Sequence, residues 1–205
     1  PIMKCLKGKV RPTEVIFDGP DNIAVNLVEL TDDDPSSKVG QMKIYTQKNG
    51  RTPTGLTPVV TSAHTTRDID LDVVFHRKVL QNELLIDEVL SSEEQNEFLQ
   101  LPRNAKTAVK FMQGNHMFGK IALSQPLNYE CHDMVPDGIA PNIGYISQAF
   151  EVHDLGFSEK AISDLGCEIY NQRRLVDFPG LGRIEIITVR APGSGALQLI
   201  FQSKG

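Results

Sequence analysis

The sequence has few cysteines, no long apolar run and no excess of basic residues, and each shortage excludes a class of protein. Its three cysteines are odd in number, lie far apart and form no CxxC motif: Cys5, Cys131 and Cys167. This pattern argues against a disulfide framework and a cysteine zinc site, and it predicts a protein of the reducing cytoplasm. No apolar run approaches the roughly 18–20 residues that a membrane span needs, so we expect no membrane partner.

Charge and composition narrow the possibilities further. The 21 basic and 26 acidic residues give a net charge of -5, and the sequence contains no basic stripe. Because nucleic-acid binding usually needs such a stripe, we expect no nucleic-acid partner. The 205 residues, 40% of them hydrophobic and 23% charged, suit one large or two small globular domains. The chain starts at Pro1 and soon becomes strand-like, so we expect it to be a fragment of a longer protein.

The most informative feature that is present is an internal repeat. In the first copy, VVTSAHTTRDID (59–70) reads as a strand that runs into acidic helix-start residues. A helix should follow, because apolar residues recur at helical spacing and predict one buried face: Leu71, Val74, Phe75 and Val79. Capping serines, acids and a final proline predict a short helix over 91–102. Strand-like segments complete the copy at 83–90, 107–114 and 119–126.

The same order of elements returns in the second half of the chain. YISQAFEVHDLG (145–156) is a strand ending in the same acidic signal, so that Asp154 takes the place of Asp68. A helix that ends at Gly166 is again predicted by an apolar stripe, made of Phe157, Ala161 and Leu165. Strand-like segments follow at 167–175, 182–190 and 195–202. Both copies are therefore predicted to be βαβββ units.

The N-terminal residues look like an incomplete third copy. EVIFDGPDNIAVNLVEL (14–30) resembles the last two strands of a unit, joined by the turn DGPDN. We therefore predict a partial module with a linker, a complete module, and a linker with a second complete module, at residues 1–56, 57–127 and 128–205. Turn-rich and charge-rich runs predict exposed connections at 31–40, 47–55 and 128–138.

Two in-phase copies of this kind resemble the vicinal oxygen chelate superfamily, which includes glyoxalase I, extradiol dioxygenases and bleomycin-resistance proteins. RDIDLDVVFHRKVLQNELL (67–85) is similar to that superfamily's helix entry, and PGLGRIEIITVRAPGSGALQLIFQ (179–202) to its closing hairpin. The resemblance implies an α+β fold in which paired βαβββ modules form curled mixed sheets around a cleft. It also implies a homodimer, because families of this fold commonly dimerise.

The resemblance also defines where a metal site is expected. In metal-dependent members, the first and last strands of each module offer His, Glu or Gln ligands to one divalent ion. The matching positions are Thr61, Ala122, Ser147 and Gln198, of which only Gln198 is a residue type that these proteins use. We therefore predict no conventional metal site and no cofactor. Strand alternation turns His64 towards the helix layer, so it joins Gln198 as a metal-ligand candidate only if a bulge or a one-residue shift reverses it.

Small, neutral residues at the expected cleft favour binding of a small organic molecule without a metal ion. Alternation along each strand predicts the cleft-facing residues to be Thr61, Ala63, Ala122, Ser124, Ser147, Ala149, Gln198 and Ile200. Two alternatives remain open. One is a lyase, isomerase or extradiol-type dioxygenase that depends on divalent iron, manganese, nickel or zinc. The other is a scaffold whose modules serve only in dimerisation.

Overall fold

The first complete module is a four-stranded mixed sheet with one long helix. The computed structural model describes the chain except for residues 1–3, 7–12, 21–22, 140 and 204–205. In the first module the strands lie in the order β4-β7-β6-β5, and β4 runs parallel to β7. The helices are α2 (Ile69–Lys78), between β4 and β5, and the short α3, between β5 and β6. The remaining bounds are β4 (Thr61–Thr65), β5 (Glu83–Leu90), α3 (Glu93–Phe98), β6 (Thr107–Gln113) and β7 (Lys120–Pro126).

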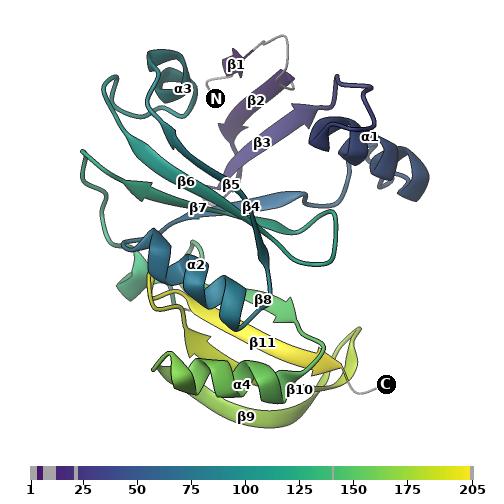
Figure 1. Ribbon diagram of the computed structural model, residues 1–205, viewed down its shortest axis with the longest axis vertical. Coiled ribbons are helices and arrows are strands. Elements are labelled where there is room, and N and C mark those ends of the chain that lie inside the picture. The colour runs from purple at the N-terminus through teal and green to yellow at the C-terminus, as the bar shows by residue number, and fades with distance from the viewer. Residues whose placement is uncertain (1–3, 7–12, 21–22, 140, 204–205) are drawn as a thin grey trace.

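The second module repeats this arrangement. Its strands lie in the order β8-β11-β10-β9, with β8 parallel to β11. The elements are β8 (Ser147–Glu151), α4 (Leu155–Asp164), β9 (Ile169–Phe178), β10 (Gly182–Arg190) and β11 (Leu197–Ser203). In both modules the first strand therefore pairs in parallel with the last. The predicted α+β fold with two βαβββ modules is confirmed (Figure 1).

The repeated acidic signal supplies the N-cap residue of the longer helix in each complete module. Asp68 caps α2, where its carboxylate accepts hydrogen bonds from the backbone N–H groups of Asp70 and Leu71 at 3.1 and 3.0 Å. Asp154 caps α4 by accepting from the backbone N–H of Phe157 at 3.0 Å. An N-cap carboxylate satisfies donors that the first helical turn leaves free, and it suits the positive end of the helix dipole. The two aspartates therefore set equivalent boundaries between strand and helix.

Helix α2 packs against both sheets, which is why its apolar face differs from the predicted one. Ile69 and Val73 pack with the first sheet, and they form a core with Met112, Ile121 and Leu123. The other side of α2 packs with α4 and the second sheet, and that larger core consists of Phe75, Val79, Leu80, Leu155, Ile162, Ile187, Val189 and Ile200. Figure 1 shows α2 lying between the two sheets.

Three residues of the predicted helical stripes are exposed. Leu71 and Val74 on α2, and Phe157 on α4, lie at the surface, whereas Leu155 and Ile162 are the fully buried residues of α4. The stripe prediction was wrong at these positions because it assumed one buried face for each helix. A helix packed between two sheets buries two faces, and helical spacing does not say which they are.

The N-terminal region contains a small antiparallel sheet and one helix. The strands β1 (Lys4–Leu6), β2 (Thr13–Asp18) and β3 (Ala24–Glu29) lie in the order β1-β2-β3, so the predicted hairpin is present. Helix α1 (Lys38–Asn49) was not predicted: it starts inside the 31–40 run and extends into the 47–55 run. Its N-cap is Ser37, whose hydroxyl accepts from the backbone N–H of Gly40 at 2.9 Å.

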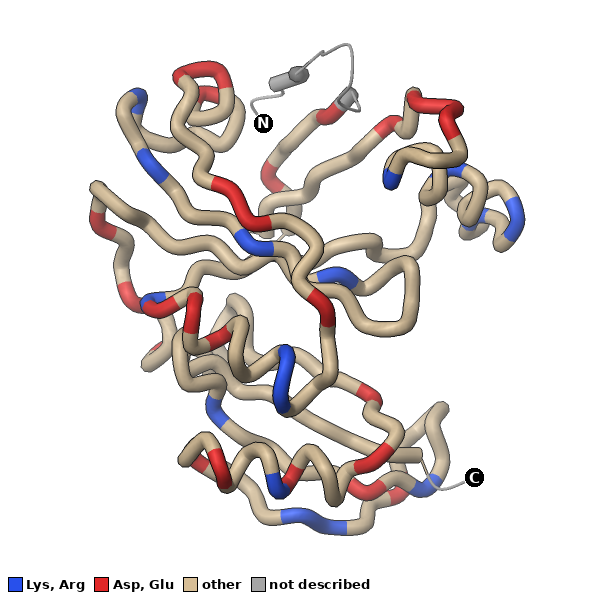
Figure 2. Tube along the Cα trace, viewed as in Figure 1, with Lys and Arg blue, Asp and Glu red and all other residues tan. Residues whose placement is uncertain are grey.

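The distribution of surface charge does not indicate a particular class of binding partner. Acidic and basic residues are interspersed over both modules (Figure 2). Among the described helices, none is both long and apolar enough to cross a membrane. Cys131 and Cys167 are free thiols, whereas the Cys5 side chain lies outside the described part of the chain. The 128–138 connection contains one short 3-10 helix, Val135–Asp137.

Candidate functional site

The two sides of the second sheet differ in what covers them. We call the side packed against α2 and α4 the helix side, and the other side the open side. On β8 and β11, Ser147 pairs with Leu197 and Ala149 with Leu199. Directly paired residues share one side of a sheet. Because Leu197 and Leu199 line a surface groove, this set belongs to the open side.

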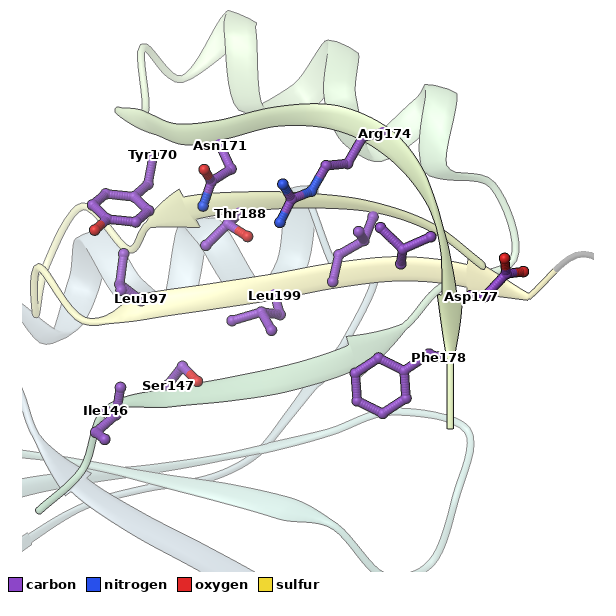
Figure 3. A pocket seen from close by; sticks show the side chains of 12 residues that line it. Ile146, Ser147, Tyr170, Asn171, Arg174, Asp177, Phe178, Thr188, Leu197 and Leu199 are labelled. Atoms are coloured by element: carbon purple, nitrogen blue, oxygen red, sulfur yellow. The ribbon is translucent and has the colours of Figure 1, made fainter. Parts of the chain in front are cut away.

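The open side of the second sheet carries a groove of about 370 Å³. Its lining is mainly apolar and includes Ile186, Leu197 and Leu199. Figure 3 shows Leu197 and Leu199 on β11. Tyr170 lies at one end of the groove and Phe178 at the other. The lining is completed by Ile146, Ser147, Asn171, Arg174, Val176, Asp177 and Thr188. An apolar lining with a few polar groups is the usual composition of a small-molecule site.

Three polar side chains of the groove come from neighbouring strands. Arg174 and Asn171 project from β9, and Thr188 from β10 (Figure 3). Pairing explains this placement, since Arg174 lies opposite Ile186 and Asn171 opposite Thr188. The sequence predicts these strands but does not indicate that they contribute to a site. Irregular pairing around Thr188 interrupts the simple alternation that would have revealed it.

The structure places six of the eight predicted cleft residues on open sides. Ser147 lines the groove, and Ala149 shares its side of the sheet without lining it. On the first sheet Ala63 pairs with Ala122, so those two residues share one side. It is the open side, because the adjacent Ile121 and Leu123 pack with α2. By alternation and pairing, the same side holds Thr61 and Ser124.

The placement of Gln198 and Ile200 was wrong by one residue. They pair with Gln148 and Phe150 on the helix side and are 1% and 0% exposed. The open-side positions of β11 belong instead to Leu197 and Leu199. Apolar residues occur on both sides of β11, Leu197 and Leu199 on one and Ile200 on the other, so hydrophobic alternation could not establish which residues face the groove.

A second group of polar residues is half-buried where the two modules meet. On the helix side of β4, His64 pairs with Leu123 and its ring stacks on Tyr145, with 5.2 Å between ring centroids. Gln148 of β8 donates from Nε2 to Ser62 Oγ of β4 at 3.0 Å, which ties the first strands of the two modules together. His64 therefore lies on the side that strand alternation predicts.

Asp72 of α2 joins the first module to a turn of the second. Its Oδ1 atom accepts hydrogen bonds from the backbone N–H groups of Gly193 and Ser194 at 2.8 and 3.3 Å, and the residue is 1% exposed. A Cβ on Gly193 would lie 2.0 Å from the Asp68 carbonyl oxygen, so only glycine permits this close approach. The 192–195 turn therefore has a structural role at the junction.

Burial controls the protonation of the aromatic groups in this region. It lowers the pKa of His76 from 6.5 to about 3, and the neighbouring His64 acts in the same direction. Burial also lowers the pKa of His64, while Asp72 opposes that change. It raises the pKa of Tyr145, and a hydrogen bond with Gln198 opposes this effect. Both histidines are therefore neutral near pH 7.

The side chains at the expected metal positions do not fit a divalent ion. The open side of β4 and β7 offers only hydroxyl and methyl groups there, and β11 offers Leu197 and Leu199. The two alternative ligand candidates, His64 and Gln198, face the helix side. Within the described ranges, no three His, Cys, Asp or Glu side chains form a group that could hold a metal ion. Iron, manganese, nickel and zinc sites normally use such imidazole, thiolate or carboxylate ligands.

Comparison with solved structures shows which fold this is. A glyoxalase family protein from Bacillus cereus matches 76% of this chain and 100% of its own, with 15% identity and a TM-score of 0.63. A variant of glyoxalase I from Zea mays matches 98% of this chain and 59% of its own, with 15% identity and a TM-score of 0.57. Unmodified Zea mays glyoxalase I matches at 14% identity with a TM-score of 0.51.

These matches show a glyoxalase-like fold. The chain covers 59% of the length of Zea mays glyoxalase I. No protein-family model matches the sequence, and no curated protein is significantly similar to it.

Proposed function

We propose that this protein binds a small organic molecule in the groove on the open side of its second sheet, without a bound metal ion. The observation that carries the proposal is the groove itself, with its mainly apolar lining that includes Ile186, Leu197 and Leu199. Apolar contacts would supply affinity, and the polar groups at Ser147, Asn171 and Thr188 would orient the ligand. This site differs from the predicted inter-module cleft, because only Ser147 of the eight expected residues lines the groove and four of them lie on the other module.

A metal-dependent lyase, isomerase or dioxygenase is the second candidate, and the donor set argues against it. A Lewis-acid ion in this fold would need donors on the first and last strands of the modules. Those strands present Thr61, Ala122, Ser147 and Leu199 on their open sides. We therefore propose that any activity of this site proceeds through its own polar side chains.

Replacing Ser147 by tryptophan is expected to block the groove. Ser147 is exposed and lines the groove, so the indole would occupy ligand space without disturbing the core. The probes are small aromatic and aliphatic molecules that raise the melting temperature of the wild type. They should bind Ser147→Trp at least about tenfold more weakly, because the indole removes apolar groove surface that the ligand would otherwise contact. Thermal-shift screening followed by isothermal titration measures this effect.

The control is Ser163→Trp, which adds the same side chain on the exposed surface of α4. It should bind the same molecules as the wild type. Equal binding to both tryptophan variants would place the ligand elsewhere and contradict the proposal. Amide chemical-shift mapping on the wild type provides an independent location of the bound molecule.

We also propose that the protein forms a homodimer. Three large apolar side chains are exposed on the groove side of β9 and in the turn that follows it: Tyr170, Phe178 and Leu181. Pairing of two copies would remove this surface from water. Light scattering during size-exclusion chromatography should give twice the 22.7 kDa mass of one chain. A single-chain mass at micromolar concentration would contradict the proposal.

A further inference from the structure

We propose that the ligand of the groove carries a carboxylate, and that Arg174 recognises it. This inference rests on the proposed function and adds the chemical class of the ligand. The guanidinium of Arg174 points over the groove, next to Asn171 and Thr188 (Figure 3). A carboxylate there would receive two parallel N–H donors from the arginine. Its apolar body would lie on Leu197 and Leu199.

Arg174 and the neighbouring Arg173 differ in whether their side chains form ion pairs. Arg173 points to the other side of β9, where it forms ion pairs with Glu159 at 3.0 Å and Glu185 at 2.5 Å. Both carboxylates hold its pKa above the usual value. The side chain of Arg174, in contrast, forms no ion pair or hydrogen bond with any residue that the structure describes. Figure 2 shows this basic segment along β9.

The polar groups around Arg174 suit an oxyanion. Thr188 can donate from its hydroxyl and Asn171 from its amide, and neither side chain is hydrogen-bonded to another described residue. The two residues are directly paired on β9 and β10, and Arg174 is paired with Ile186 on the same two strands. Three potential donors therefore lie beside the apolar residues of the groove.

The charge of the groove favours a carboxylate over a phosphate. Arg174 supplies one positive charge, and Asp177 at the rim supplies one negative charge. A phosphate monoester carries close to two negative charges at pH 7, so one guanidinium leaves it incompletely neutralised beside a carboxylate. A monoanionic carboxylate matches the single cation.

The test uses three probes of the same shape: 2-naphthoate, its neutral amide and naphthyl phosphate. Wild-type protein is expected to bind the carboxylate about tenfold more tightly than the amide at pH 7 and low salt, since the amide forms no charge-assisted hydrogen bonds. Arg174→Met should reduce carboxylate affinity to that of the amide and leave amide affinity within about twofold. Arg174→Lys should keep part of the preference, because the ammonium retains the charge but not the fork of donors.

The control variant is Arg173→Met, which removes the neighbouring guanidinium from the helix side and should preserve the preference. Equal binding of carboxylate and amide, or an unchanged preference in Arg174→Met, would overturn the carboxylate assignment while leaving a groove that binds. Tighter binding of naphthyl phosphate would overturn it in favour of a phosphate ligand. Binding of none of the three probes, or binding unaffected by Ser147→Trp, would overturn the proposed function as well.

Discussion

Replacement of Asp72 by alanine is expected to lower the free energy of unfolding by about 3 kcal/mol. The carboxylate accepts two backbone hydrogen bonds from the 192–195 turn, at Gly193 and Ser194, inside the junction between the modules. Hydrogen bonds to a charged group contribute roughly 1.5–3 kcal/mol each, and their loss leaves two N–H groups buried without an acceptor. Relief of the buried charge offsets part of that cost. Urea unfolding monitored by circular dichroism measures the change.

Asp72→Asn is the matched comparison, because it retains an acceptor oxygen and removes the charge. Its free energy of unfolding should stay within about 1 kcal/mol of the wild type, since neutral hydrogen bonds are weaker but a buried charge is also removed. The second carboxylate oxygen, Oδ2, is buried and has no hydrogen-bond partner among the described residues. An alanine variant as stable as the wild type would show that the junction does not depend on this contact.

Acidification is expected to destabilise the protein by about 2 kcal/mol between pH 6.5 and pH 5 through His76 alone. Burial gives this histidine a pKa of about 3 in the folded state, whereas an unfolded histidine has a pKa of 6.5. The unfolded chain therefore binds a proton that the folded chain does not, and stability falls by roughly 1.4 kcal/mol per pH unit below pH 6.5. The stabilisation is fully present above pH 6.5 and decreases towards pH 3.

The groups that face His76 determine how steep this dependence is. His64, on β4 of the same module, also has a lowered pKa and adds to the loss, whereas Asp72 favours the protonated form of His64 and reduces its contribution. On its own helix side, His76 Nδ1 lies 3.1 Å from Asn82 Nδ2, and its ring meets Phe150 edge-on with 5.7 Å between centroids. Protonation would place a charge against that aromatic and apolar surface.

His76→Phe should remove most of the pH dependence between pH 5 and pH 6.5, because phenylalanine fills similar space and does not titrate. Urea midpoints measured at half-unit pH intervals give the slope. His132→Phe is the control, since His132 is exposed in the inter-module connection. A slope that is unchanged in His76→Phe would assign the acid sensitivity to other groups.

The order of elements was predictable from sequence because each signal is local. Asp68 and Asp154 end their strands and cap the helices that follow, and the contacts that achieve this span only two or three residues. Two copies of the same order then indicated the fold. Helix α1 was missed because its segment is rich in charge and turn formers and has no acidic residue in its first turn.

The sequence determined the modules, their strands and the side of β4 that His64 occupies, because those features depend on neighbouring residues and on strand alternation. Only the tertiary structure decided which faces of α2 and α4 are buried and which side of β11 faces the groove. Helix α2 lies between two sheets, and β11 carries apolar residues on both of its sides, so their apolar patterns are compatible with more than one orientation. The tertiary structure also decided which polar side chains line the groove. Arg174, Asn171 and Thr188 come together through the pairing of β9 with β10, and the register shifts around Thr188 cannot be deduced from simple strand alternation.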